Sequence, residues 1–272
     1  MAQVKTLLKW MVLMTGLFVV TCLHAEISPD LLKRAEEDDA QAKYQVGLKY
    51  FRGDGVAKDQ EEAVGFFQFA AEKGIPEAQL LLGVCYSKGV GLEKNDKIAA
   101  EWFTKAAKQG LTEAQTMMAL YYDAGIGVAQ DKNEAFKWFY AAAEQGDPSA
   151  QYNIALRCLR GVGTEANEKE AVEWFRLASL QGVPEAQNNL AVCYAEGIGV
   201  GKNKEEALFW FYTALAGGVK SAKEPIAIIE KELDGKMSVL AKERCKQVLE
   251  QVKLKQENEP PPILVEEDLP AK

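Results

Sequence analysis

The chain has 272 residues, of which 48% are hydrophobic and 26% charged, a composition typical of a folded soluble protein. Its formal net charge of −8 argues against general nucleic-acid binding, because such binding needs a basic footprint. Five cysteines without a Cys-x-x-Cys pair exclude a disulfide-dense scaffold and zinc or redox motifs of that type.

Residues 1–25 have the features of a signal peptide. Lys5 and Lys9 form a basic region, an apolar stretch covers 10–20, and residues 23–25 offer a cleavage site. This apolar stretch is shorter than the about 20 residues that span a bilayer. We therefore expect export, either to the periplasm or to the exterior. Two alternatives stay open, and only these imply membrane association: a retained anchor, or lipidation at Cys22, where Thr21 departs from the usual lipoprotein pattern.

Removal of residues 1–25 would change the chemistry of the chain. His24 is its only histidine, and without Lys5 and Lys9 there remain 30 basic residues against 40 acidic ones, a net charge near −10. The absence of histidine excludes Ser-His-Asp and Cys-His catalysis. It also leaves a structural zinc site dependent on scattered thiolates, so we predict no metal and no cofactor.

Residues 26–38 are predicted to form a lone capping helix. Ser28 suits an N-cap, Pro29 the first helical position, and Asp30 the first turn.

Columns of the same residue type then recur with a period of 36 residues. The columns hold glycine (Gly74, Gly110, Gly146, Gly182, Gly218), alanine (Ala42, Ala78, Ala114, Ala150, Ala186, Ala222), and phenylalanine (Phe67, Phe103, Phe139, Phe175, Phe211). No row needs an insertion, which defines five repeats: 39–74, 75–110, 111–146, 147–182 and 183–218. Periods of this length indicate arrays of stacked supersecondary units.

Each row predicts two helices, A and B. In the first row, Ala42, Val46 and Tyr50 form a helical stripe over about 40–51, and Gly53 ends helix A. Helix B is expected over about 59–73, closed by Gly74. A pair of this kind buries its aromatic face only against neighbouring pairs, so the predicted fold is an all-α solenoid of helix-turn-helix repeats.

Residues 219–254 are predicted to form C-terminal capping helices. The first begins like a helix A, but Pro225 and Glu230 interrupt the pattern, and a charged amphipathic helix follows over 237–253. Residues 255–272 contain three consecutive prolines and an acidic cluster, a composition that predicts disorder.

The second row shows a specific motif: Ala78, Gly83, Tyr86, Gly89, Gly91, then Ala99, Trp102, Phe103, Ala106, Ala107 and Gly110. It resembles the Sel1-like repeat family, relatives of the tetratricopeptide repeats, over residues 39–218. The resemblance implies a right-handed superhelix whose inner surface holds proteins or peptides, and a role as an exported adaptor or scaffold. The departures are few, with alanine replacing the first glycine in three rows and Cys158 replacing the tyrosine.

Two other function classes stay open: a cell-wall or penicillin-interacting hydrolase, and a purely structural spacer. The hydrolase lacks a nucleophile with a base, since no serine is followed by lysine three residues on. Residues 197–202 superficially resemble a phosphate loop, but the required first glycine is Glu196 and the repeat itself explains the Gly-x-Gly. We predict that the chain is not an enzyme and has no catalytic residue.

Variable positions on the A helices are the candidate partner groove, because the resemblance places these helices on the concave side. The candidate residues are Lys49, Arg52, Leu81, Lys88, Met117, Tyr121, Arg157 and Arg160. Basic residues and apolar anchors together predict an acidic or C-terminal peptide as partner. The alternative is that these are merely solvated helix faces. The chain's own acidic tail, with Glu266, Glu267 and Asp268, is a further conceivable occupant.

The cysteines at 85, 158, 193 and 245 are expected to be small buried residues. A disulfide between Cys158 and Cys193 is the alternative, because they stand in adjacent rows at neighbouring helix positions.

Overall fold

The structure is a computed structural model of the whole chain, and it describes residues 27–258. That part is helical throughout and contains no strand. It divides into two compact units, with the boundary between Ala106 and Ala107. The signal peptide predicted for 1–25, Cys22 and the tail from 259 onward lie outside the described residues.

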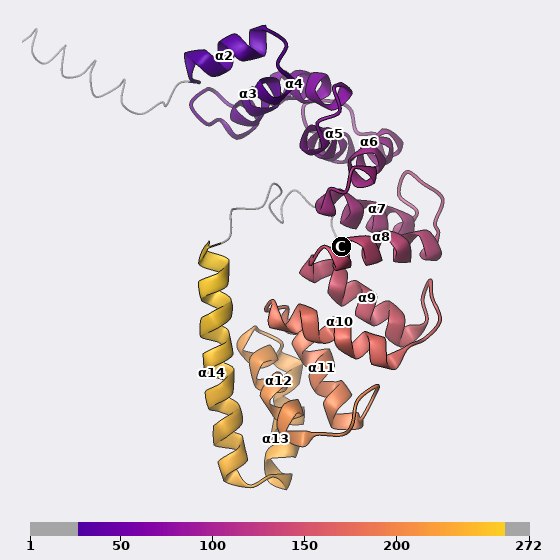
Figure 1. Cartoon of the computed structure of the whole chain (residues 1–272), viewed down its shortest axis with the longest axis vertical. Helices are drawn as coiled ribbons and strands as arrows, with labels where there is room; N and C mark the ends of the chain where they lie inside the picture. Colours follow the sequence, from indigo (N-terminus) through magenta and orange to yellow (C-terminus); the bar gives the residue numbers. More distant parts are fainter. Residues whose placement is uncertain (1–26, 259–272) are drawn as a thin grey trace, which may run out of the picture. The chain divides into compact units, whose positions relative to one another are not determined.

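Paired helices of 13 residues, from α3 to α12, make up most of both units (Figure 1). The first unit contains α2 (Pro29–Glu36), α3 (Ala40–Arg52), α4 (Gln60–Glu72), α5 (Pro76–Lys88) and α6 (Asp96–Lys108), which ends just past the boundary. The second contains α7 (Thr112–Ala124), α8 (Lys132–Glu144), α9 (Pro148–Arg160), α10 (Glu168–Leu180), α11 (Pro184–Glu196), α12 (Lys204–Ala216), a short 3₁₀ helix η1 (Lys220–Ala222), α13 (Lys223–Glu232) and α14 (Gly235–Asn258). The predicted A and B helices of all five rows are therefore present.

Helix ends follow the predicted chemistry. Asp59 caps α4 by accepting a hydrogen bond from the Glu62 amide, and Asn203 caps α12 in the same way. Gly53 ends α3 in the left-handed conformation, with φ of 76°. The same glycine recurs at the end of every A helix, so the turn to helix B has one geometry throughout.

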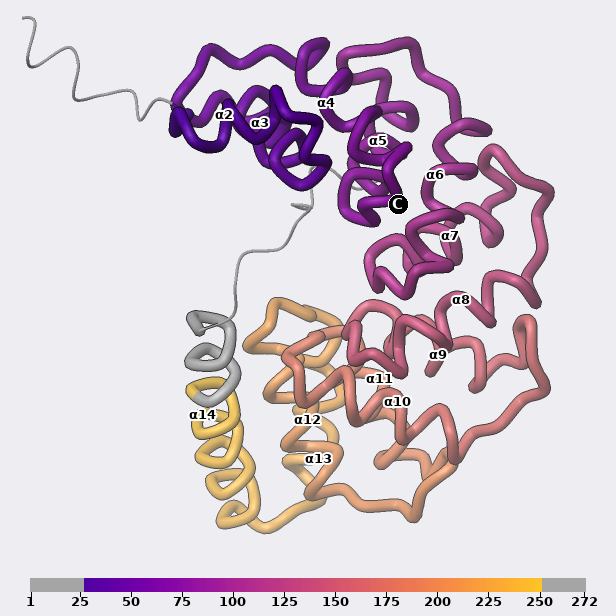
Figure 2. Tube along the Cα trace, turned by 45° about the horizontal axis from the view of Figure 1, so that its top comes forward, coloured from indigo at the N-terminus to yellow at the C-terminus, as the bar shows by residue number. Residues whose placement is uncertain are grey.

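Within each hairpin, an aromatic ring of helix B lies on a small residue of helix A. Phe103 is fully buried, and a Cβ placed on Gly83 would lie 2.6 Å from its ring. Phe67 lies over Gly47 in the same manner. Consecutive helices contact one another along each unit, from α2 to α5 and from α7 to α12 (Figure 2). This arrangement confirms the predicted solenoid of helical hairpins.

Buried glutamines join successive repeats in the second unit. Gln151 Nε2 donates to the Ala143 carbonyl at 3.2 Å, in addition to the backbone bond that this carbonyl accepts from the Gly146 amide at the end of α8. Gln181, at the end of the same repeat as Gln151, donates to Gln151 Oε1 at 2.8 Å and to the Gly146 carbonyl of the preceding repeat at 2.9 Å. The equivalent Gln145 donates to Gln115 Oε1 within its own repeat at 2.7 Å. The bonds to Ala143 and Gly146 fix the register between neighbouring hairpins, and the bonds between glutamines join the two helices of one hairpin.

The capping segments agree with the predictions except in two details. Ser28 caps α2 by accepting from the Leu31 amide at 3.2 Å, and α2 contacts α3. At the other end, Pro225 lies inside the first turn of α13, where a missing N–H costs nothing, and Glu230 also lies within this helix. Both were wrongly predicted to break the pattern; the interruption is the 3₁₀ turn before α13. Residues 255–258, predicted to be disordered, continue α14.

Glu230 ties the end of the array together. Its Oε1 accepts hydrogen bonds from Ser238 Oγ at 2.6 Å, from the Tyr212 hydroxyl, and from Lys242 Nζ at 3.1 Å. Tyr212 belongs to α12, whereas Ser238 and Lys242 belong to α14, so one carboxylate connects three helices. These hydrogen bonds, the Ser238 bond foremost, lower the pKa of Glu230 to about 2.

We expect Gly199→Ala to destabilise the second unit by about 2 kcal/mol or more. Gly199 has a φ of +64°, and a Cβ there would lie 2.2 Å from the Glu168 carbonyl oxygen of the preceding repeat. Gly201→Ala is the matched control, because a Cβ there meets nothing within 4 Å. Urea unfolding measures both; equal midpoints would show that the close approach of Gly199 to the Glu168 carbonyl does not require glycine.

Glu230→Gln should weaken the capping helices at neutral pH and leave acid stability almost unchanged. Because the pKa of Glu230 falls from 4.5 to about 2 on folding, its stabilisation is present above pH 4.5 and is lost as the pH falls toward 2. The difference in urea midpoint between wild type and variant should therefore shrink over that range. Glu243→Gln, an exposed carboxylate on α14, is the control and should show no such convergence.

Candidate functional site

The predicted apolar anchors of the groove are not on an open surface. Leu81, Met117 and Tyr121 are 3%, 2% and 1% exposed, respectively. Leu81 belongs to α5, which packs on α4, and Met117 and Tyr121 belong to α7, which packs on α8. The expectation that these three side chains offer themselves to a partner is therefore corrected.

The five predicted basic residues divide between the two units. In the first unit, Lys49 is half-buried and pairs with Asp54 at 3.2 Å, Lys88 is half-buried, and Arg52 is exposed. In the second unit, Arg160 is exposed at the end of α9, whereas Arg157 is buried. The charges of Lys49 and Arg157 are thus already compensated within the chain.

Arg157 connects three helices of the second unit. Its Nη2 lies 2.5 Å from Asp123 Oδ1 at the end of α7, and its guanidinium lies 4.9 Å from the centre of the Phe139 ring on α8. Lys132 reaches the same carboxylate at 2.9 Å. Nε and Nη1 of Arg157 are buried without hydrogen-bond partners among the described residues. Burial alone would raise the pKa of Asp123, but the bonds from Lys132 and Arg157 outweigh it, and the pKa is lowered.

A different column of helix A remains partly open, one residue before the position of Arg157. It is aliphatic in all five repeats and continues into α13: Leu48, Val84, Leu120, Leu156, Val192 and Ile228. We call its four members in the second unit, from Leu120 to Ile228, the helix-A stripe. The first three are half-buried and Ile228 is 52% exposed. The 36-residue period identifies this column. Because its aliphatic character is the same in every repeat, it is not among the variable positions from which the groove is predicted.

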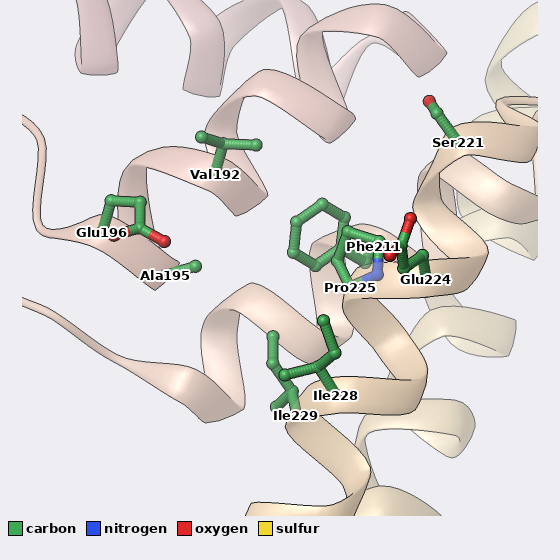
Figure 3. A pocket seen from close by; sticks show the side chains of 9 residues that line it. All are labelled: Val192, Ala195, Glu196, Phe211, Ser221, Glu224, Pro225, Ile228 and Ile229. Carbon is green, nitrogen blue, oxygen red and sulfur yellow. The ribbon is translucent and has the colours of Figure 1, made fainter.

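A pocket of about 340 Å³ opens where the stripe ends. Val192 and Ala195 of α11 face Pro225, Ile228 and Ile229 of α13, and Phe211 of α12 lies behind them (Figure 3). The remaining lining residues are Glu196, Ser221 and Glu224. Volumes from about 300 Å³ upward are typical of ligand sites with mainly apolar walls and few polar groups.

The pocket's charge is acidic. Glu196 and Glu224 are the charged residues of its lining, and both are exposed. Lys202 approaches Glu196 only to 4.0 Å, and both side chains remain about two thirds exposed, at 67% and 66%. A pair with this geometry contributes little, so the Glu196 carboxylate stays available to a partner.

Amide and hydroxyl groups flank the stripe between α9 and α11. Asn189 Nδ2 donates to the Tyr152 hydroxyl at 3.4 Å, and Tyr152 packs near Phe175, with ring centres 6.1 Å apart. Asn188 and Asn153 are half-buried beside them. Side-chain amides offer both a donor and an acceptor, which suits the backbone of a bound peptide.

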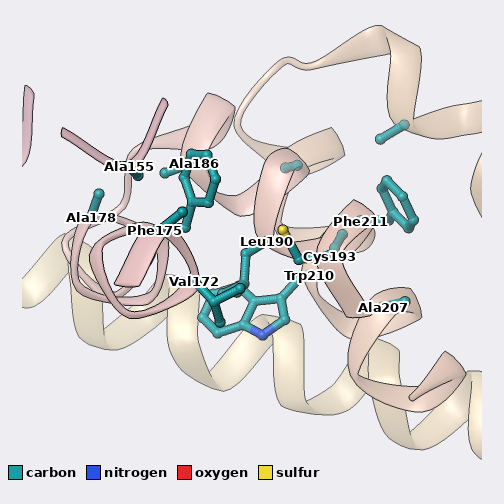
Figure 4. Close-up of a cluster of buried hydrophobic side chains, with 14 of the residues drawn as sticks. Ala155, Val172, Phe175, Ala178, Ala186, Leu190, Cys193, Ala207, Trp210 and Phe211 are labelled. Carbon is teal, nitrogen blue, oxygen red and sulfur yellow. The ribbon is translucent and has the colours of Figure 1, made fainter. Parts of the chain in front are cut away.

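The cysteines belong to the packing and not to a reactive centre. Cys193 lies among Leu190, Trp210 and Phe211 in the core of the second unit (Figure 4). All four described cysteines are free and buried, so the expected role as small apolar residues is confirmed and the Cys158–Cys193 disulfide is not formed. Burial raises the pKa of both thiols to about 11, which disfavours the nucleophilic thiolate.

Within residues 27–258, no group of three or more histidine, cysteine or carboxylate side chains is arranged to hold a metal ion. None of the helices in this range combines the length and the apolar character needed to cross a membrane.

Removing Asp123 should lower the free energy of unfolding more than removing Arg157, although the two side chains form one ion pair. Asp123→Ala leaves the Arg157 guanidinium buried without a counter-charge, which should cost about 3 kcal/mol. Arg157→Met removes two unpaired N–H groups and leaves Asp123 with Lys132, so the loss should stay below about 1 kcal/mol. Urea unfolding of both variants decides this; equal losses would show that Arg157 is held mainly by packing.

Comparisons with known proteins agree with this geometry. The model of the Sel1 repeat matches residues 40–75, 76–111, 112–147, 148–183 and 184–219, each one residue after the predicted row. A Sel1 repeat protein from Oxalobacter formigenes is 32% identical, with a TM-score of 0.67, over 84% of this chain and 91% of that one.

A protective antigen of uropathogenic Escherichia coli strains, displaying an SLR fold, is 27% identical, with a TM-score of 0.57, over 85% of this chain and 59% of that one. No curated protein matches the chain. Sel1 repeat proteins are generally protein-interaction scaffolds without catalysis. With five matched repeats and the hairpin geometry described above, the chain belongs to the Sel1 repeat family.

Proposed function

We propose that this protein is an exported scaffold that binds a protein or peptide partner along the helix-A stripe of its second unit. The pocket between α11 and α13 carries the proposal, because two members of the stripe, Val192 and Ile228, line it. Membership of a family of interaction scaffolds supports the same role. Export is supported by the signal-peptide features of residues 1–25.

The stripe distinguishes a scaffold from a spacer. A spacer needs its apolar positions only for stacking, so a position on which no hairpin stacks would have no reason to stay aliphatic. Ile228 instead keeps the aliphatic character of its column, although half of its surface is exposed. Partly exposed aliphatic groups beside half-buried amides, such as Asn188, are typical of a surface that a partner covers.

A hydrolase is the weaker alternative. The pocket's only hydroxyl side chain is Ser221, and its lining contains no lysine or other base beside it except the carboxylates Glu196 and Glu224. Ser221 lies at the far edge of the lining from Glu196 (Figure 3). Geometry of this kind supports binding and not nucleophilic catalysis.

Fewer of the predicted cations are available to bind an acidic partner. Lys49 and Arg157 are paired within the chain, and the exposed Arg52 and Arg160 belong to separate units. We therefore place the partner's main contact on the aliphatic stripe, with Arg160 at its edge as a site for a carboxylate.

Photo-cross-linking from defined positions tests the proposal. A benzophenone side chain replacing Leu156 on the stripe should give a discrete cross-linked product in the native envelope or secreted fraction. The same group replacing Leu180, which is 53% exposed on the helix-B side, is the matched control and should not. Circular dichroism confirms that both variants are folded.

The partner is identified from the product at position 156 by mass spectrometry and then tested with purified components. Equal products from both positions would contradict binding on the stripe. The absence of any product at 156, with the folded protein at its native level, would favour the spacer.

A further inference from the structure

We infer that the pocket between α11, α12 and α13 binds an apolar side chain of the partner that is flanked by lysine or arginine. This inference rests on the proposed function, because it assigns the chemistry of the partner at the end of the helix-A stripe.

The walls of the pocket fit an aliphatic anchor. Val192 and Ala195 form one side, Ile228 and Ile229 the other, and Phe211 closes the base (Figure 3). Phe211 and Ile229 are 1% and 6% exposed, so the base is rigidly packed, whereas Ile228 is 52% exposed at the opening. A side chain inserted here would cover Ile228 and complete an aliphatic layer that the chain leaves open.

The pocket exists because the repeat pattern is incomplete after residue 218, where η1 and α13 take the place of a sixth helix A. The 3₁₀ turn at 220–222 delays the start of α13, and after α13 the chain turns into α14, which packs on α12. The array thus ends without another hairpin stacked against α13. Ile228 retains the aliphatic character of its column, but within residues 27–258 no further A helix covers it.

The charge of the pocket favours basic residues on either side of the partner's apolar side chain. Both charged residues of the lining, Glu196 and Glu224, are carboxylates, and they come from the two opposite walls. A peptide with a basic residue on each side of an apolar one would place a cation near each carboxylate. Arginine suits this arrangement best, since its guanidinium can donate two parallel hydrogen bonds to a carboxylate.

The same charges disfavour the chain's own tail as occupant. Its aliphatic segment, residues 263–265, is followed directly by Glu266, Glu267 and Asp268. Placing that segment in the pocket would bring like charges beside Glu196 and Glu224, which is unfavourable. A basic partner therefore fits the pocket better than this part of the chain.

Methyl NMR of the full-length protein, labelled at isoleucine, tests the inference with defined peptides. The probe is a capped heptapeptide, Gly-Ser-Arg-Leu-Arg-Ser-Gly; its controls replace both arginines with glutamate, or leucine with serine. The first peptide should shift the methyl signals of Ile228 and Ile229 and leave that of Ile154, in the core of the unit, unchanged. Both controls should bind at least about tenfold more weakly.

Charge reversal provides the sharper comparison. The double variant Glu196→Lys with Glu224→Lys should prefer the glutamate peptide to the arginine peptide. Glu185→Lys, an exposed carboxylate at the other end of α11, is the control and should keep the wild-type preference. Replacement of residues 263–265 by serine should leave the affinity for the arginine peptide unchanged.

Equal shifts with the arginine and glutamate peptides, or shifts that persist when leucine is replaced by serine, would overturn the inference. A gain in affinity on replacing 263–265 would also overturn it, by showing that the tail occupies the pocket. A cross-link from position 156 without any peptide shift at Ile228 would refute the pocket's chemistry and leave the scaffold intact. Failure of the cross-link alone would refute the scaffold and not the pocket.

Discussion

A helical hairpin of this size cannot enclose its own aromatic residues, and the whole structure depends on that constraint. Phe139 becomes fully buried only because the small Ala119 lets helix A lie close beneath it and because the neighbouring hairpin covers the other side. The pairing of one large and one small residue fixes the distance between helices, and the buried glutamines fix their register. Every repeat must therefore have the same length, and no row of the array has an insertion.

The same constraint makes the ends of the array different from its interior. An interior A helix is covered on both sides, so its partly open face is narrow. In the part of the chain that the structure describes, no further hairpin stacks on the outer side of α13, and Glu230 holds this helix in place through hydrogen bonds to α12 and α14. That attachment keeps Ile228 and Ile229 in place while their layer remains incomplete. The structure thus concentrates exposed apolar surface where the repeat stops.

Much of the fold could be predicted from the sequence, because a repeat supplies the same evidence several times. The glycine that ends each A helix, the caps of the B helices and Ser28 before α2 are local signals with a single structural meaning. The groove could not be predicted in the same way. A helical wheel with one buried face treats Met117 and Tyr121 as outward, but both side chains are buried in the structure.

Variation between repeats also has two causes that one sequence does not separate. Positions such as Tyr121, Arg157 and Cys193 share a column and differ because neighbouring hairpins fill the space between them differently. Arg157 even brings its own counter-charge, so a cation that looks like a partner contact is compensated by Asp123. With such cations paired inside, the charged residues that line the second unit's pocket are Glu196 and Glu224, and Lys202 approaches Glu196 only to 4.0 Å. In the proposed function, the chemistry of recognition therefore depends on two features at the end of the array: the aliphatic character that Ile228 shares with its column, and the two carboxylates beside it.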